Sequence, residues 1–203
     1  MRIKNLTTNE LKVIGISGSL RKDSYNRKAL RIAKQLALKI GIDVEEIDLK
    51  ELNLPLYDGD IESGGFPDLV KRMRTSIKES DVLLIATPEY NHSVPGGLKN
   101  AIDWLSTAEN VLDGKVAAIF GASTGQFGTM RAQQNLRQIL TALNVIILPQ
   151  PQVFIRSAKE SFNPDGSLND LKVQAQLKEL VEKTFQLAKV INRFNSHQTN
   201  KYS

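Results

Sequence analysis

A short segment near the N-terminus brings together side chains that can bind an anion. Its hydroxyl, guanidinium and amide groups belong to Ser17, Ser19, Ser24, Arg21 and Asn26, and it leads into a predicted helix over residues 25–40. Hydroxyls, backbone N–H groups and a helix N-terminus can together hold a phosphate, and Arg21 adds positive charge. The segment lacks both G-x-G-x-x-G and G-K-S/T, so it favours a compact monophosphate over a triphosphate with Mg²⁺. Ser24 or Asp23 can also cap the helix, and the two roles are compatible.

A second polar loop follows the apolar run of residues 81–86, which predicts a buried parallel strand. This loop carries prolines at positions 88 and 95 and glycines at 96 and 97, which together give a stiff turn. Open α/β sheets bind ligands at the carboxyl ends of their strands. We therefore expect the loops after the first and third strands to face each other. Another glycine-rich turn, at residues 121–128, follows the fourth predicted strand.

The elements that must position these loops alternate along the chain. Strands are predicted at residues 11–17, 42–49, 81–86, 115–121 and 145–148, with helical periodicity between them. This alternation predicts an α/β, flavodoxin-like three-layer sandwich whose five-stranded parallel sheet has the order 2-1-3-4-5. Residues 152–155 are a candidate short extra strand. We expect one domain over residues 11–193, a flexible lead-in at 1–10 and a polar tail at 194–203.

Two segments leave alternatives open. Residues 53–65 form a long loop with little periodicity, which is either a lid over a binding site or an excursion over the surface. Trp104 lies off the apolar stripe of its predicted helix, which suggests a subunit contact. The alternative for Trp104 is ordinary packing under a neighbouring loop.

Taken together, these residues resemble the NAD(P)H-dependent FMN reductase family, a branch of flavodoxin-like proteins that includes quinone, chromate and azo-dye reductases. The resemblance covers about residues 13–149. It rests on the combination of Gly18-Ser19-Leu20-Arg21-Lys22-Asp23-Ser24-Tyr25-Asn26-Arg27 with Pro88-Glu89-Tyr90-Asn91.

The resemblance implies three groups of FMN contacts. The first loop would bind the phosphate, the second would wrap the isoalloxazine ring largely with backbone groups, and the third turn would add a contact. The residues implied are Ser17, Ser19, Leu20, Arg21, Lys22, Asp23, Ser24, Tyr25 and Asn26; Pro88, Glu89, Tyr90 and Asn91; and Ala122, Ser123 and Thr124. Asp23 stands where many relatives have glycine and is expected to point outward, away from the phosphate. His92 replaces an aromatic residue of many relatives.

The implied activity is FMN-dependent transfer of electrons from NADPH or NADH to a small-molecule acceptor. The nicotinamide gives hydride to flavin N5 and leaves, and the acceptor then enters the same space in a ping-pong cycle. Because the cofactor carries the reactivity, we expect no catalytic side chain. Quinones, azo compounds, nitroaromatics, chromate and free flavin all fit as acceptors. Relatives form dimers or dimers of dimers, so a homodimer or homotetramer is expected.

Composition restricts the other possibilities. The 203 residues include no cysteine, which excludes disulfides and cysteine nucleophiles and fits a reducing cytoplasm. The two histidines, at positions 92 and 197, make a protein-borne transition-metal site improbable. No apolar stretch is long enough for a transmembrane helix. The net charge of +5 is spread along helix faces without an arginine-rich block, which favours an anionic small ligand over nucleic acid.

Several residues allow a second interpretation. His92 could protonate a reduced quinone, or could simply line the mouth of the cleft or a subunit contact. Glu89 and Asp103 could be paired carboxylates for hydrolysis, but such residues more often cap helices or form salt bridges. Arg131 resembles a family arginine near the active-site rim, and could equally be a solvated helix charge.

Two other functions remain possible from the sequence. A flavodoxin that only transfers electrons is one, although flavodoxins with redox partners are usually acidic and this chain is basic. A phosphate-binding module of the same fold is the other, although it would leave the loop from Pro88 to Asn91 unexplained. NADPH consumption separates the first alternative from the reductase, and bound flavin separates the second.

Overall fold

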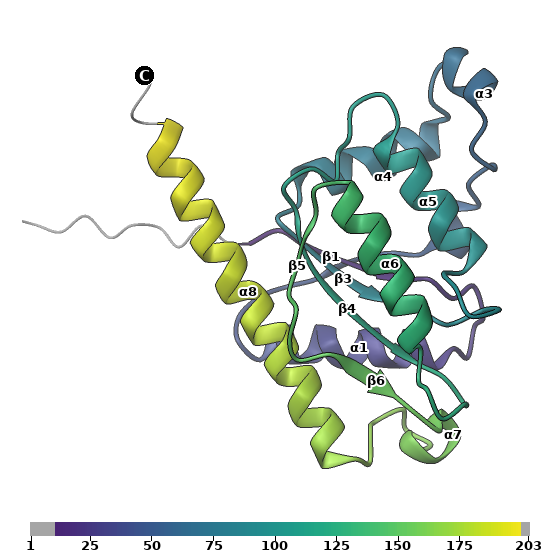
Figure 1. The fold of residues 1–203 in the computed structure, drawn as a ribbon, viewed down its shortest axis with the longest axis vertical. Helices are drawn as coiled ribbons and strands as arrows, with labels where there is room; N and C mark the ends of the chain where they lie inside the picture. The colour runs from purple at the N-terminus through teal and green to yellow at the C-terminus, as the bar shows by residue number, and fades with distance from the viewer. Residues whose placement is uncertain (1–10, 200–203) are drawn as a thin grey trace, which may run out of the picture.

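A parallel sheet with the order β2-β1-β3-β4-β5 forms the centre of the molecule (Figure 1). The computed structural model describes residues 11–199, so the predicted lead-in at residues 1–10 lies outside the described residues. The flavodoxin-like strand order predicted from the sequence is confirmed. The strands are β1 (Val13–Ser17), β2 (Glu45–Ile47), β3 (Val82–Ala86), β4 (Val116–Ala122), β5 (Ile146–Ile147) and β6 (Val153–Ile155).

Helices cover both faces of the sheet, which gives three layers (Figure 1). One face is covered by α1 (Tyr25–Leu38) and α8 (Leu171–Thr199), and the other by α4 (Asp68–Glu79), α5 (Gly96–Ser106) and α6 (Met130–Ala142). Short helices α2 (Leu49–Leu52), α3 (Gly59–Ser63) and α7 (Ala158–Ser161) lie in the connections. Among residues 11–199, none of these helices combines the length and the hydropathy that crossing a bilayer requires.

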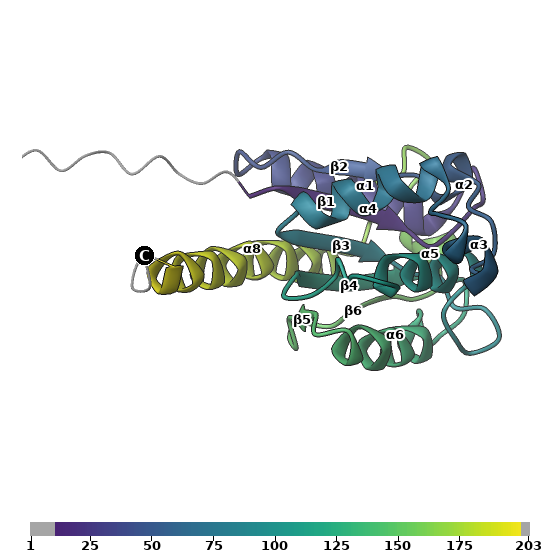
Figure 2. The ribbon, with the colours of Figure 1, turned by 90° about the horizontal axis from the view of Figure 1, so that it is seen from above.

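The last helix extends into the predicted polar tail. The domain was expected to end at residue 193, but α8 runs from Leu171 to Thr199. Figure 2 shows its C-terminal turns extending past the edge of the sheet. Those turns expose Val190 and Phe194, each with 62% of its surface accessible, whereas Leu177, Leu180 and Val181 earlier in the helix are fully buried.

The central strand β3 shows why its sequence is an unbroken apolar run. Val82 and Leu84 pack into the layer beneath α1 and α8, whereas Leu83 and Ile85 pack into the layer beneath α4, α5 and α6. Successive side chains of a strand point to opposite faces, so a strand covered on both sides is apolar at every position. All five residues of β3 are buried.

The sheet has six strands, which corrects the expected five. The predicted fifth strand, at residues 145–148, is β5, which pairs with β4 at Val116 and Ala117. The candidate extra strand, at residues 152–155, is β6, which pairs with β4 from Phe120 to Ala122. Phe120 of β4 has β3 on one side and β6 on the other. β6 therefore lies on the side of β4 that faces away from β3, which is also the side of β5. Pro149 and Pro151 separate the two strands. Proline has no N–H to donate to a neighbouring strand, so the pairing breaks there and resumes at the candidate extra strand.

The segment of residues 53–65 is fastened to α5 and contains helix α3. The Asn100 side chain accepts a hydrogen bond from the Tyr57 backbone N–H at 2.7 Å and donates one to the Pro55 carbonyl at 2.9 Å. Trp104 Nε1 donates to the same carbonyl at 2.9 Å, and Trp104 is fully buried. The expectation of an exposed Trp104 in a subunit contact is therefore wrong. Packing under a neighbouring loop is confirmed, because that loop covers the side of α5 that faces away from the sheet.

Candidate functional site

Three loops meet at the carboxyl edge of the sheet, after β1, β3 and β4. The strands are in register there, since Ser17 pairs with Ala86 and Ala86 pairs with Phe120. A Cβ atom on Gly18 would lie 3.2 Å from Pro88 Cδ, so the first two loops touch. A Cβ on Gly121 would lie 2.2 Å from the Thr87 carbonyl oxygen, so the second and third loops approach too closely for any residue but glycine.

The first loop presents backbone donors at the N-terminus of α1. Ser24 is the N-cap, and its Oγ accepts a hydrogen bond from Asn26 N at 3.1 Å. Within residues 11–199, the N–H groups of Lys22, Asp23 and Tyr25 have no acceptor. Unsatisfied N–H groups and the helix dipole make such an end attractive to an anion. The predicted capping role of Ser24 is confirmed, and it leaves these donors available.

The side chains of the first loop divide into buried and exposed groups. Ser17 and Ser19 are buried, and their Oγ atoms accept hydrogen bonds from the loop's own N–H groups at 3.3 and 3.4 Å. Arg21, Lys22 and Asp23 are exposed. Among the described residues, Arg21 has no carboxylate partner, so its guanidinium is free to meet a ligand. Leu20 rests against Gly97 and remains 46% exposed.

An ion pair between Arg27 and Asp48, which the sequence did not indicate, supports the first loop. Arg27 donates two hydrogen bonds of 2.6 Å to the Asp48 carboxylate and one of 3.4 Å to the Ser19 carbonyl. The bidentate bond from Arg27 holds the pKa of Asp48 below its usual value, and the same bond raises the pKa of Arg27. Asp48 also caps α2. The two residues are 21 positions apart, and no local pattern identifies them as partners.

Asn26 connects the first loop to the third. Its Nδ2 donates to the Ala122 carbonyl at 2.9 Å, and its Oδ1 accepts from the Ala122 N–H at 2.8 Å. Asn26 and Ala122 are 3% and 4% exposed. Asn26 was predicted to contact the phosphate directly, but the structure assigns its amide to the backbone of β4. Ala122, predicted as a flavin contact, is likewise engaged with Asn26.

In the second loop, the Glu89 side chain points away from solvent and caps helix α6. Its Oε2 accepts from Arg131 N at 3.0 Å and from Ala132 N at 3.2 Å, and its Oε1 accepts from Arg131 Nε at 2.7 Å. Asp103 instead pairs with Lys99 at 2.6 Å on α5. The hypothesis of a Glu89–Asp103 catalytic pair is therefore wrong, and the alternative of caps and salt bridges is confirmed for both.

The tip of the second loop is a tight two-residue turn. Tyr90 and Ser93 exchange backbone hydrogen bonds of 3.1 and 3.0 Å, and the residues between them, Asn91 and His92, have φ values of 48° and 64°. Asparagine and histidine are both among the non-glycine residues that adopt this left-handed region more often than others. Asn135 on α6 braces the turn by donating to the His92 carbonyl and Ser93 Oγ. Tyr90, Asn91 and His92 are exposed at this edge.

The third loop completes the edge with small and aromatic groups. Ser123 N donates to Ile155 of β6, and Ser123 Oγ accepts from Gly125 N at 3.1 Å, while Thr124 is exposed. Phe127 is 56% exposed, and the Arg131 guanidinium lies 4.8 Å from its ring centre. Arg131 is thus at the rim of the loops, but its charge is paired with Glu89.

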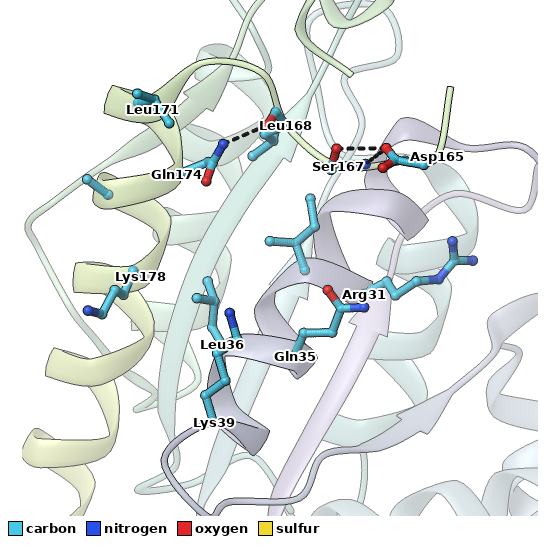
Figure 3. Close-up of a pocket in the computed structure, with 13 residues that line it drawn as sticks. Arg31, Gln35, Leu36, Lys39, Asp165, Ser167, Leu168, Leu171, Gln174 and Lys178 are labelled. Atoms are coloured by element: carbon cyan, nitrogen blue, oxygen red, sulfur yellow. Dashed lines mark hydrogen bonds between the residues drawn. The ribbon is translucent and has the colours of Figure 1, made fainter. Parts of the chain in front are cut away.

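A groove of about 630 Å³ lies elsewhere, between α1 and the start of α8 (Figure 3). Arg31 of α1 and Lys39, the residue after α1, line one side of it, and Leu171 and Lys178 of α8 line the other. Asp165, also on this groove, bonds to Ser167 within its own turn. The groove faces the outer side of the α1–α8 layer and contains none of the predicted ligand-binding residues. We therefore place the candidate site at the three loops.

Comparison with known protein families identifies the class of protein to which the chain belongs. Residues 11–160 match the model of the NADPH-dependent FMN reductase family, and the chain belongs to that family. The resemblance predicted from the two loop motifs is confirmed. The protein is accordingly a flavin-dependent NAD(P)H oxidoreductase, with FMN as cofactor and NAD(P)H as co-substrate.

Individual relatives cover nearly the whole chain. The NAD(P)H-dependent FMN reductase of Pseudomonas aeruginosa is 48% identical over 178 residues, which are 85% of this chain and 95% of that protein. The NAD(P)H:quinone oxidoreductase of Solanum tuberosum is 39% identical over 173 residues, which are 83% of this chain and 88% of that protein. Among solved structures, FerB, a flavoenzyme NAD(P)H:(acceptor) oxidoreductase from Paracoccus denitrificans, matches with a TM-score of 0.78 and is 33% identical. The match covers 90% of this chain and 98% of FerB.

Proposed function

We propose that the three loops bind one FMN per chain, with its phosphate on the first loop and its ring against the second and third. The supporting observation is the set of N–H groups without acceptors at the N-terminus of α1, on a loop that approaches the second loop where Gly18 lies against Pro88. A phosphate needs several donors in one concavity, and the loop supplies them from its backbone. The donors and the exposed Arg21 therefore fit the FMN phosphate.

In this proposal the predicted residues have different tasks. The backbone of Lys22 to Tyr25, with Ser19 and Arg21, holds the phosphate, and the backbone of Glu89 and Asn91 offers N–H groups to the ring. Asn26 and Ala122 act indirectly, because their hydrogen bonds to each other fix the distance between the first and third loops. Thr124 lies at the rim and is available to the ligand.

Bound FMN supplies hydride acceptance from the nicotinamide and electron delivery to the second substrate. The protein binds and orients both substrates, and no side chain is needed as an acid or base. Exposed Tyr90 and Phe127 border the open edge, and these rings favour planar, aromatic acceptors. We therefore propose a quinone as the acceptor, in line with the name of the potato relative. The exposed basic side chains near the first loop favour NADPH slightly over NADH.

A homodimer or homotetramer is part of the proposal. Large apolar side chains remain exposed near the site, among them Leu56 at 80%, Phe127 at 56% and Tyr90 at 48%. Leu56 lies between Pro55 and Tyr57, whose backbone groups Asn100 and Trp104 hold against α5, so the backbone at Leu56 is in place before any partner arrives. The cytoplasmic location expected from the sequence belongs to the same proposal, and light scattering tests the oligomer.

The deciding experiment is an absorbance spectrum of the purified protein supplied with FMN, before and after NADPH is added without oxygen. Uptake of FMN followed by bleaching supports the proposal, and subsequent reoxidation by a benzoquinone supports the proposed acceptor. Bound FMN that stays oxidised with both NADPH and NADH would instead indicate an electron-transfer flavodoxin. A folded protein that takes up no FMN would refute the site.

A further inference from the structure

Glu89 belongs to the second loop, but its carboxylate makes its hydrogen bonds with residues of helix α6. It satisfies the free N–H groups of Arg131 and Ala132 in the first turn of α6, where the N-cap residue, Thr129, offers no side-chain acceptor. It also accepts from the Arg131 guanidinium, and its side chain is only 9% exposed. A carboxylate 42 residues away in sequence therefore caps this helix.

This contact joins two of the three loops. Glu89 is part of the second loop, and α6 begins where the third loop ends, so the carboxylate fixes one loop relative to the other. It also balances charge: the N-terminus of a helix carries a partial positive charge, and Arg131 adds a full one. The Glu89 side chain is 9% exposed and the Arg131 side chain 42%, so water screens the ion pair in part, from the side of the guanidinium.

We propose that Glu89 is a positioning residue that holds the flavin loops together and also lowers the reduction potential of bound FMN. This inference rests on the proposed function, because it assumes FMN beside the second loop. Reduction adds negative charge to the flavin. A carboxylate behind the loop opposes that charge, and the Arg131 guanidinium and the α6 N-terminus favour it. Glu89 compensates both, so the two side chains of this ion pair act on the potential in opposite directions.

The test uses two nearly isosteric changes and one control. Glu89→Gln removes the negative charge but keeps an oxygen that can accept from the α6 backbone, and Arg131→Gln removes the positive charge. Glu79→Gln is the matched control: it removes an exposed carboxylate, paired with Lys12 at 3.0 Å, at the opposite end of the sheet. Each variant is loaded with FMN, its affinity is titrated, and its midpoint potential is measured by equilibration with a reference dye.

We expect Glu89→Gln to make the potential less negative, Arg131→Gln to make it more negative, and Glu79→Gln to leave it unchanged. Glu89→Ala, which also loses the cap, should weaken FMN binding about tenfold or more, and Glu89→Gln should recover part of that loss. A purely structural role could lower affinity but would not give shifts of opposite sign. Unchanged potentials, or shifts in the same direction, in variants that still bind FMN would overturn this inference alone. Wild-type protein that binds no FMN would overturn it together with the proposed function.

Discussion

The two hydrogen bonds between Asn26 and Ala122 give the most specific prediction, because their loss distinguishes a structural role of Asn26 from direct contact with the FMN phosphate. Asn26→Ala removes both partners of a buried backbone N–H and C=O on Ala122. Each buried group left unpaired costs about 1–3 kcal/mol. We expect the free energy of unfolding to fall by about 2–4 kcal/mol, a large part of the total stability of a domain.

The assay is urea denaturation of the FMN-free protein, followed by circular dichroism. The matched control is Asn135→Ala, which removes an amide whose hydrogen bonds to His92 and Ser93 lie at the partly exposed edge. Water can replace those bonds, so the control should lose about 1 kcal/mol or less. If Asn26→Ala costs the FMN-free protein less than about 1 kcal/mol but still weakens FMN binding, Asn26 contacts the phosphate directly and the structural reasoning is wrong.

Three other changes have defined outcomes. Arg21→Ala should weaken FMN binding by about 1.5–3 kcal/mol, the scale of a charged hydrogen bond; unchanged affinity in a titration would remove Arg21 from the site. Gly121→Ala should abolish the native fold, because its Cβ would lie 2.2 Å from a backbone oxygen, whereas Gly96→Ala, with nothing within 4 Å, should retain the fold and FMN binding; equal melting temperatures would contradict this. The depressed pKa of Asp48 gives stability that is present above pH about 4 and is lost as the pH falls through the folded-state pKa. Asp48→Asn should therefore lower stability at pH 7 and flatten its decline in acid, as measured by urea unfolding from pH 7 to 2; a parallel decline would refute the linkage.

The parallel sheet could be predicted because each buried strand has a local signature. Residues 81–86 were expected to form a strand and β3 spans Val82–Ala86, since a strand covered on both faces must be apolar throughout. The pairing of the last two strands, β5 and β6, could be predicted only in part. Prolines at positions 149 and 151 mark where pairing must stop. Whether the chain then returns to β4 depends on the path of the connection, which no local pattern specifies.

The location of the candidate site could also be predicted from the sequence, but the role of each residue within the site could not. Small polar residues before a helix predict an anion-binding turn, and the structure places unsatisfied N–H groups there. Asn26 has a side chain suited to binding a phosphate, but its amide instead donates a hydrogen bond to a carbonyl 96 positions later. Trp104 lies off the apolar stripe of α5 and is nevertheless fully buried, because residues 53–65 fold over it.

The sequence by itself thus determined the order of strands and helices, the edge of the sheet at which the loops gather, and the chemistry that those loops offer. These properties follow from periodicity and from residue types at neighbouring positions, which act over a few residues. The tertiary structure alone decided that Asn26 joins two loops, that Glu89 caps α6 and that Arg27 pairs with Asp48. Each of these contacts joins residues 21 to 96 positions apart. Such a partner is selected by the packing of whole elements, because packing fixes where each side chain points and what it meets.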